Sequence, residues 1–238
     1  MNKQLTIVLN GKGGVGKSFF ATNFVQYLKD HGIEHHAIDT DNENSTLTRF
    51  HPEAQFVSLT QPQELDAVFL ALEKGRLVIV DCRAASSDIF IDYFAEIQAF
   101  DLLDKLDTAL TVVSPVNHEA DSVEQLKVVI AAFDARCRYV IVRNQVHSEH
   151  FRLYDGSQTR NALLNRLGAR EILMPRLYEW LVTGLSSGNH SITAAIAGSD
   201  FSLVDRQRLK NWQNAFYRQI EAASDLLLPP GLQVEAAK

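Results

Sequence analysis

The chain has 238 residues, of which 46% are hydrophobic and 22% are charged, a balance typical of a globular protein with a sizeable core. It contains no apolar run as long as a membrane span, and its start lacks a signal-peptide pattern. The formal charge of −6 argues against nucleic-acid binding by bulk charge alone, and the two cysteines lack metal-type spacing. We therefore expect a cytoplasmic protein that does not insert into a membrane.

Strand-like and helix-like segments alternate along the chain. We predict strands over 4–9, 35–39, 55–59, 76–81, 108–114 and 138–142, and helices over 17–29, 62–74, 120–134 and 203–228. The strands are mostly continuous apolar runs, which are typical of parallel strands buried on both faces, and the helices supply the crossovers. The sequence therefore predicts a doubly wound α/β fold with a mostly parallel sheet. We expect one domain over 1–228 and a flexible tail over 229–238.

The segment GKGGVGKS, residues 11–18, lies between the first predicted strand and the first predicted helix. It satisfies the pattern G-x-x-x-x-G-K-[ST] of a phosphate-binding loop (P-loop) in the required strand–loop–helix context. Glycines permit a tight loop whose N–H groups surround phosphate oxygens, and the helix N-terminus adds the positive end of its dipole. We expect Lys17 to reach the β- and γ-phosphates and Ser18 to ligate Mg²⁺. The predicted nucleotide contacts are Gly13, Gly14, Val15, Gly16, Lys17, Ser18 and Phe19.

A second lysine, Lys12, lies inside the same loop. The stretch KGGVGKS resembles the deviant Walker A motif, K-G-G-x-G-K-[ST], of the ParA/MinD family of ATPases. The resemblance implies Mg-ATP as the ligand and an ATP-dependent homodimer, in which Lys12 reaches the phosphates bound by the partner subunit. Lys12 would then act like an arginine finger. The alternative for Lys12 is a solvated loop lysine.

Two later segments are similar to the switch regions of that family. In AIDTDNENST (residues 37–46, the first switch), Asp39 would support the loop near Mg²⁺ and Asp41 would orient the attacking water. In LVIVDCRAAS (residues 77–86, the second switch), Asp81 would hold Mg²⁺ through water. The implied metal site therefore consists of Ser18, Asp39 and Asp81, and the implied catalytic groups are Lys12, Lys17 and Asp41.

The chain departs from the family pattern in both switches. Asn42 stands where family members often have proline, and Arg83-Ala84 stands where Pro-Pro is frequent. These departures leave open the shape of the first switch, and the movement and partner coupling of the second.

The adenine contacts are implied by softer similarities. Asn144 follows the predicted strand over 138–142 and matches the family's adenine-reading asparagine, although a strand-end asparagine is also a common turn former. The segment ILMPRL resembles the stretch that lies beside the base, which places Pro175 and Arg176 there.

Residues 136–176 contain eight arginines against three acidic residues. They are either solvated surface side chains or a basic face for an acidic partner, such as a DNA backbone contacted without sequence specificity.

The front of the chain is most similar to plasmid conjugative-transfer ATPases of the TraL type, and two functions stay open. In the first, a slow, partner-stimulated ATPase forms an ATP-dependent dimer that positions plasmid DNA or the transfer or partition machinery. In the second, a nucleotide-gated module with little or no turnover binds a protein, either to recruit that partner or to position it at a cell pole. The presence of Lys17, Ser18, Asp41 and Asp81 favours the first, and the altered second switch keeps the second open.

Overall fold

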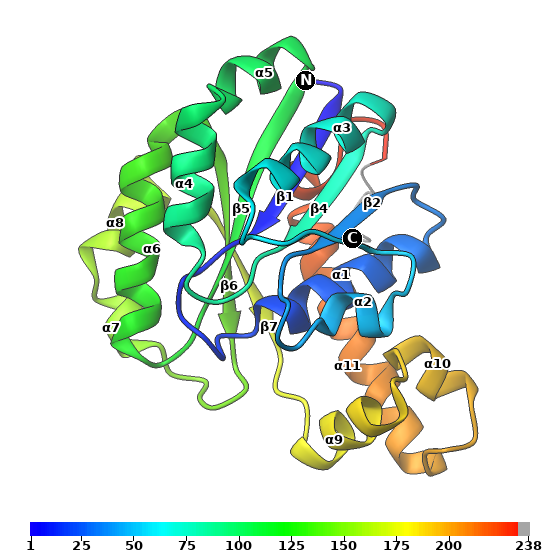
Figure 1. The fold of residues 1–238 in the computed structure, drawn as a ribbon. Coiled ribbons are helices and arrows are strands. Elements are labelled where there is room, and N and C mark those ends of the chain that lie inside the picture. The colour runs from blue at the N-terminus through cyan, green and yellow to red at the C-terminus, as the bar shows by residue number, and fades with distance from the viewer. Residues whose placement is uncertain (233–238) are drawn as a thin grey trace.

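The computed structural model describes residues 1–232, which form a seven-stranded sheet covered by helices on both faces (Figure 1). Every strand pair is parallel, and the strand order is β3-β2-β4-β1-β5-β6-β7. The strands are β1 (Lys3–Val8), β2 (His36–Asp39), β3 (Gln55–Phe56), β4 (Leu77–Asp81), β5 (Thr108–Val116), β6 (Arg138–Asn144) and β7 (Arg170–Met174). The predicted doubly wound parallel fold is confirmed.

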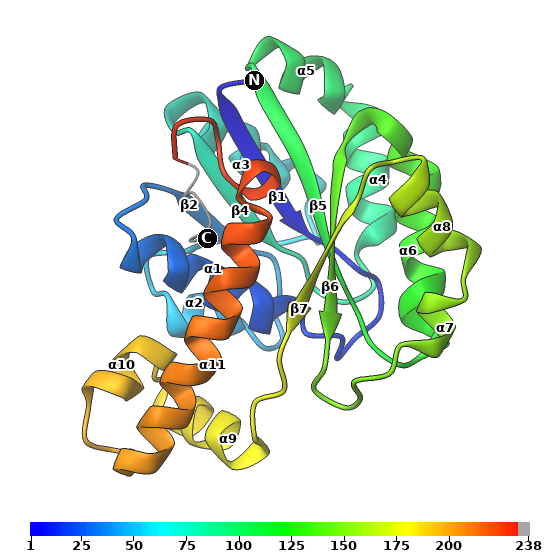
Figure 2. The same ribbon diagram turned by 180° about the vertical axis from the view of Figure 1, so that it is seen from behind.

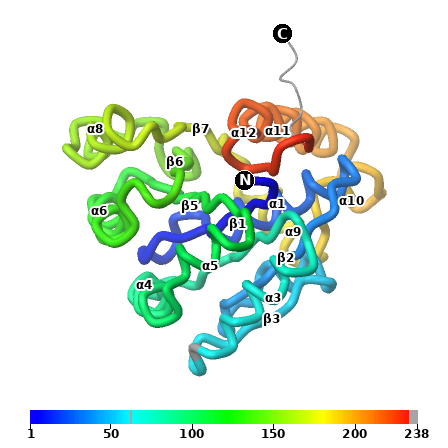
Figure 3. Tube along the Cα trace, turned by 90° about the horizontal axis from the view of Figure 1, so that it is seen from above, coloured from blue at the N-terminus to red at the C-terminus, as the bar shows by residue number. Residues whose placement is uncertain are grey.

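The helices lie in two layers, as the views from behind and from above show (Figures 2 and 3). On one face lie α1 (Lys17–Asp30), α9 (Glu179–Gly188), α10 (Ile192–Ala197), α11 (Leu203–Ala222) and α12 (Ser224–Leu227). On the other lie α3 (Asp66–Lys74), α4 (Ser87–Glu96), α5 (Ala99–Lys105), α6 (Ala120–Phe133), α7 (Arg152–Asp155) and α8 (Gln158–Asn165). The short helix α2 (Thr46–Phe50) contacts α1. Within residues 1–232, no helix is long and apolar enough to cross a membrane.

Strand β1 shows why the apolar runs do not alternate with polar residues. Leu5 and Ile7 pack into the core under α3–α6, whereas Val8 packs into the core under α1 and α11. On that second face, Phe20 of α1 meets Phe216 of α11 edge to face, with ring centroids 5.7 Å apart. Because both faces of the sheet are buried, the strand needs apolar residues at successive positions.

Several predicted boundaries differ from the observed ones, each for a local reason. Strand β5 continues through Pro115, which has no N–H to donate. The strand tolerates this because the pairing with β1 has already ended at Val113, and the Pro115 carbonyl accepts a hydrogen bond from Asn10 Nδ2 at 3.0 Å. The predicted helix over 62–74 begins with a 3-10 turn, Pro62–Leu65. The predicted strand over 55–59 is reduced to the two exposed residues of β3, at the edge of the sheet. The predicted helix over 203–228 breaks at Ala223, where the backbone leaves the helical region.

The predicted flexible tail, residues 229–238, is described only as far as residue 232. Residues 229–232 contact the body of the protein, since the guanidinium of Arg76 donates to the carbonyl of Pro230 at 2.9 Å. Residues 233–238 lie outside the described residues.

Candidate functional site

Three loops meet at the carboxyl edge of the sheet and line one part of a cavity of about 420 Å³, whose other walls are formed by α1, α2, α9 and α10. The pairing register requires this meeting, because Asp81 lies opposite both Val8 of β1 and Asp39 of β2. The loops that follow these three strands are the P-loop, the first switch and the second switch. The part of the cavity that they line consists of Gly13, Gly14, Gly16, Lys17, Ser18, Asp41, Asn44, Cys82, Arg83 and Ala84. Open α/β sheets bind ligands at such an edge.

The P-loop has the backbone conformation that its glycines allow. Gly14 and Gly16 have φ angles of 75° and 99°, in the left-handed region that L side chains rarely adopt. A Cβ atom at Gly16 would also lie 2.5 Å from the side-chain nitrogen of Asn144. The loop is anchored by Asn10, which is fully buried and whose Oδ1 accepts the backbone N–H of Lys12 at 3.0 Å. The sequence reasoning missed Asn10, although it directly precedes the motif.

The side chain of Lys17 lies inside the loop. It is buried, and its ammonium group donates to the carbonyl of Lys12 at 3.0 Å. Burial lowers its pKa, while the negative charges of Asp81 and Asp41 act in the opposite direction. Lys17 therefore lies at the cavity wall, and its contact with the β- and γ-phosphates stays a prediction.

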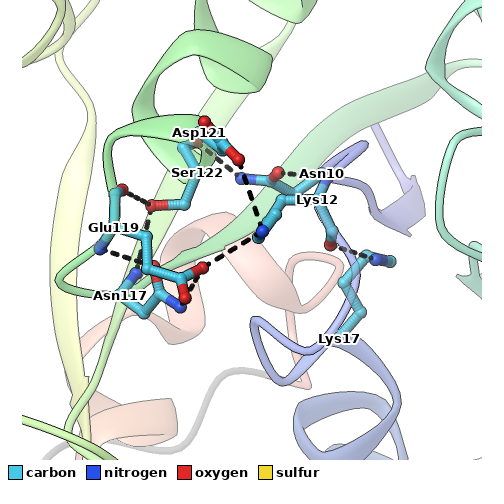
Figure 4. A network of polar contacts seen from close by, with 7 residues as sticks. All are labelled: Asn10, Lys12, Lys17, Asn117, Glu119, Asp121 and Ser122. Atoms are coloured by element: carbon cyan, nitrogen blue, oxygen red, sulfur yellow. Dashed lines mark hydrogen bonds and ion pairs between the residues drawn. The ribbon is translucent and has the colours of Figure 1, made fainter.

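The side chain of Lys12 points toward the loop between β5 and α6, away from Lys17 (Figure 4). Its ammonium group lies 3.3 Å from a carboxylate oxygen of Glu119 and 3.3 Å from one of Asp121. The hydrogen bonds to Glu119 and then to Asp121 raise the pKa of Lys12. Lys12 does not line the cavity that Lys17 lines. The two lysines of the motif therefore face different surroundings.

Asp39 organises the first switch. It is fully buried, and its Oδ1 accepts the backbone N–H of Asp41 at 3.0 Å. Its Oδ2 accepts the backbone N–H of Thr48 at 3.0 Å and the hydroxyl of the same residue at 3.2 Å. These bonds explain how Asp39 supports the loop, and because they engage both oxygens, Asp39 is less available to a metal than Asp81 is.

Asp81 is a fully buried carboxylate, and within residues 1–232 neither of its oxygens accepts a hydrogen bond of ordinary geometry, although the Ser18 hydroxyl lies close to it. Its pKa is raised to about 8, chiefly by burial and also by the nearby charge of Asp39, although the interaction with the Ser18 hydroxyl and the charge of Lys17 act in the opposite direction. An unpaired buried carboxylate is costly, and a cation beside it would offset that cost. Carboxylate and hydroxyl oxygens are ligands that Mg²⁺ accepts, so Asp81 and Ser18 fit the predicted metal.

The second switch is tied to both other loops. The Ala85 N–H donates to the Gly11 carbonyl at 2.9 Å, and the Arg83 N–H donates to the Thr40 hydroxyl at 3.2 Å. Ala85 has a φ angle of 54°, a left-handed conformation that costs a residue with a Cβ about 1–2 kcal/mol. Asp41 lines the cavity between these loops, and its carboxylate accepts N–H groups from its own loop.

The three residues predicted to contact the base do not line this cavity, and of the three Asn144 contacts the P-loop. Asn144 is buried, donates to the Val15 carbonyl at 2.9 Å and accepts the Val146 N–H at 3.1 Å. The Pro175 carbonyl accepts the indole N–H of Trp212 at 2.8 Å, and Arg176 is exposed. The structure thus gives Asn144 a supporting role in the P-loop, and its contact with a base stays a prediction.

Most arginines of the segment 136–176 are used within the chain. Arg143 and Arg160 form ion pairs with Asp155 and Glu171, and Arg166 pairs with Asp134. The guanidinium of Arg136 donates to the carbonyl of Ala132. That of Arg138 donates to oxygens of Gln4 and Asp225, and that of Arg170 donates to oxygens of Ala222 and Asp225. Within residues 1–232, only Arg152 and Arg176 of this segment are exposed without a side-chain partner. The predicted basic face is therefore smaller than the arginine count indicates.

Comparisons with known proteins agree with this geometry. Residues 6–180 match the model of the family described as the CobQ/CobB/MinD/ParA nucleotide binding domain. Protein MobD of Acidithiobacillus ferrooxidans is 26% identical, over 93% of this chain and 98% of its own. Protein TraL of Escherichia coli is 26% identical, over 94% and 99% of the two chains. The septum site-determining protein MinD of Pyrococcus horikoshii, solved with Mg-ADP, has a TM-score of 0.58 at 15% identity, over 99% and 100% of the two chains. The resemblances to ParA/MinD and TraL proteins are confirmed.

Proposed function

Since the chain belongs to the CobQ/CobB/MinD/ParA nucleotide-binding family, we propose that it is a Mg-ATP-dependent ATPase whose ATP-bound dimer positions plasmid DNA or the transfer or partition machinery. The observation that carries this proposal is the convergence on one cavity of a left-handed glycine loop, a buried lysine and two switch loops. The similarity to protein TraL supports the plasmid-transfer setting. The setting implies a cytoplasmic protein.

The phosphate end of the site follows from the P-loop. Its backbone N–H groups and the start of α1 would bind the phosphates of ATP, and Lys17 would neutralise the β- and γ-phosphates. Ser18 and Asp81 would hold Mg²⁺, with Asp39 keeping the first switch in place behind them. When bound, Mg²⁺ supplies neutralisation of the phosphate charge.

Hydrolysis also needs a positioned water and charge stabilisation in the transition state. Asp41 lines the cavity from the first switch, so its carboxylate would orient the water. Lys12 lies outside the cavity of its own chain, which supports a role toward the nucleotide of a second copy. This arrangement would couple ATP binding to dimerisation.

The alternative is a nucleotide-gated module that recruits a protein partner and turns ATP over little or not at all. The left-handed Ala85 and the departure at Arg83 favour it, because both lie in the switch that would transmit the nucleotide state. Non-specific DNA contact through the segment 136–176 would rest chiefly on Arg152 and Arg176.

Steady-state phosphate release tests the proposal. Wild-type protein with Mg-ATP should release phosphate slowly, long duplex DNA or a transfer-system partner should accelerate this, and Lys17→Ala should abolish nucleotide binding and release together. Nucleotide binding without release above the Lys17→Ala background would favour the recruitment module. No nucleotide binding by the wild type would refute both functions.

A further inference from the structure

The two departures from the family pattern meet in the structure. The Nη1 atom of Arg83, in the second switch, lies 3.4 Å from the side-chain oxygen of Asn42, in the first switch. A hydrogen bond of this length between a guanidinium and a neutral amide is weak. The backbone of Arg83 is held more firmly, by the Thr40 hydroxyl at 3.2 Å and by the Ser86 hydroxyl, which donates to the Arg83 carbonyl at 2.9 Å. The side chain is thus loosely held on a fixed backbone.

The guanidinium of Arg83 lacks the acidic partner that such a group normally finds. Within residues 1–232, no carboxylate pairs with it, and its Nε atom is buried without a hydrogen-bond partner. A buried donor without a hydrogen-bond partner is unfavourable, so a ligand that supplies an acceptor at this position lowers the free energy of the complex. In the same part of the chain, Arg138, Arg143 and Arg206 also have a buried Nε without a partner, but each donates through another guanidinium nitrogen to an oxygen at 3.1 Å or less. Among the described residues, the guanidinium of Arg83 has only the 3.4 Å contact with Asn42.

Arg83 also lines the cavity of the P-loop, and the charges of that cavity indicate an anionic ligand. Among the described residues, the lining contains Lys17, Arg49 and Arg83 against one carboxylate, that of Asp41, with the buried Asp81 beside Lys17. Asp41 directly precedes Asn42, so Arg83 lies on the side of the cavity that faces the first switch. In the proposed function, that side receives the terminal phosphate, whose attacking water Asp41 would orient.

We infer that Arg83 binds the γ-phosphate of ATP within its own subunit and, through Asn42, links the presence of that phosphate to the first switch. The inference rests on the proposed function and deepens it. Arg83 can offer two N–H groups to one phosphate in a planar fork, which a lysine cannot. Loss of the γ-phosphate would leave the side chain of Arg83 with only its weak contact to Asn42, while the backbone bond to Thr40 stays. Arg83 would thus sense whether ATP or ADP is bound, and it lies in the second switch, where the prolines frequent in the family are absent.

Equilibrium binding of Mg²⁺ with a non-hydrolysable β,γ-imido ATP analogue and with ADP tests the inference. The measurement uses the full chain at concentrations where sedimentation shows a monomer. Arg83→Ala should weaken binding of the analogue about ten- to a hundredfold, the usual range for a hydrogen bond to a charged group, and weaken ADP less than about threefold. Arg83→Lys should recover part of the loss. Retained ADP binding reports that the variant is folded.

Two further variants separate a phosphate contact from a structural role. Asn42→Ala should change the ratio of analogue to ADP affinity less than about twofold, because the phosphate contact survives. Arg218→Ala, an exposed arginine on α11, is the matched control and should match the wild type. If Arg83→Ala leaves the ratio unchanged, or if Asn42→Ala reproduces its effect, the inference is wrong while the proposed function stands. If the wild type binds neither nucleotide, both fall together.

Discussion

The ammonium group of Lys12 lies 3.3 Å from a carboxylate oxygen of Asp121, a residue in the first turn of α6 of the same chain. Glu119 pairs with the same ammonium group and is itself held by Asn117, which accepts the Glu119 N–H at 3.0 Å. The proposed reach of Lys12 into a partner subunit therefore requires these contacts to open. The ion pairs are exposed to water, where such pairs are weak, so a triphosphate in a desolvated interface can displace them.

The first prediction concerns Lys12 itself. Lys12→Ala should leave the nucleotide affinity of the monomer within about twofold, because Lys12 lies outside the cavity, while abolishing ATP-dependent dimerisation and most hydrolysis. Sedimentation with nucleotide titration measures both quantities. A Lys12→Ala protein that dimerises on ATP and hydrolyses at the parental rate would remove the trans role. A loss of monomer affinity equal to that of Lys17→Ala would make Lys12 a contact for its own nucleotide.

The second prediction concerns the carboxylates that hold Lys12. The double substitution Glu119→Gln and Asp121→Asn should lower the protein concentration needed for ATP-dependent dimerisation, by up to about fivefold, because it frees Lys12 without changing the cavity. Monomer affinity for ATP should not change. The matched control is Glu124→Gln, whose partner Lys127 is exposed and whose removal should leave dimerisation alone. Weaker dimerisation in the double variant would show that these carboxylates assist the assembly.

The third prediction concerns Asp41. Asp41→Ala should retain ATP binding and lose hydrolysis, because it removes the group that orients water and leaves the P-loop contacts intact. Asp39→Ala should behave differently: it removes the acceptor for the Asp41 and Thr48 N–H groups, so it should also lower the thermal midpoint of unfolding. Calorimetry beside phosphate release distinguishes the two variants. Normal hydrolysis by Asp41→Ala would show that the first switch was assigned wrongly.

The features that the sequence predicted well are those encoded by neighbouring residues. The P-loop follows from the spacing of its glycines and lysine, and the buried strands follow from continuous apolar runs. Features that depend on distant residues were not predictable from one sequence. Lys12 and Asp121 lie 109 positions apart in the sequence. Asn10 anchors the P-loop to Ser114 and Pro115, which belong to the neighbouring strand β5. The sequence left open how many arginines of the segment 136–176 are free, because it did not show which of them pair with Asp155 and Glu171 or that Arg170 pairs with the distant Asp225.

The fourth prediction concerns DNA. If the exposed Arg152 and Arg176 contact phosphates, binding should appear only with ATP, show little sequence preference and weaken as salt rises. Replacing both by alanine should reduce the slope of log affinity against log salt by about 0.9 for every DNA phosphate that is no longer neutralised. Replacing Arg143, which is paired with Asp155, should have little effect on that slope. Absence of binding to long duplex DNA in low salt, with the ATP-bound state verified, would favour a protein partner.

The fifth prediction concerns Asn144, which the sequence assigned to the base and the structure places against the P-loop. Its side chain donates to the Val15 carbonyl at 2.9 Å and accepts the Val146 N–H at 3.1 Å, and all of these groups are buried or half-buried. Asn144→Ala should therefore lower the free energy of unfolding by about 1–3 kcal/mol, because it leaves a buried carbonyl without a donor. Asn161→Ala, an exposed asparagine on α8, is the matched control for the stability measurement.

The two roles of Asn144 predict different nucleotide preferences. If Asn144 only supports the P-loop, Asn144→Ala should weaken the binding of ATP and of GTP by the same factor, because both nucleotides have the same phosphates. A base contact predicts in addition that the preference for ATP over GTP falls, by about fivefold or more for the removal of a hydrogen bond worth about 1 kcal/mol. Competition of both nucleotides against a fluorescent ADP measures the preference directly. We expect both effects, because Asn144 keeps a second amide hydrogen and a second lone pair beyond the two bonds it makes here. A stable Asn144→Ala protein with unchanged affinity for both nucleotides would contradict the loop contact and the base contact together.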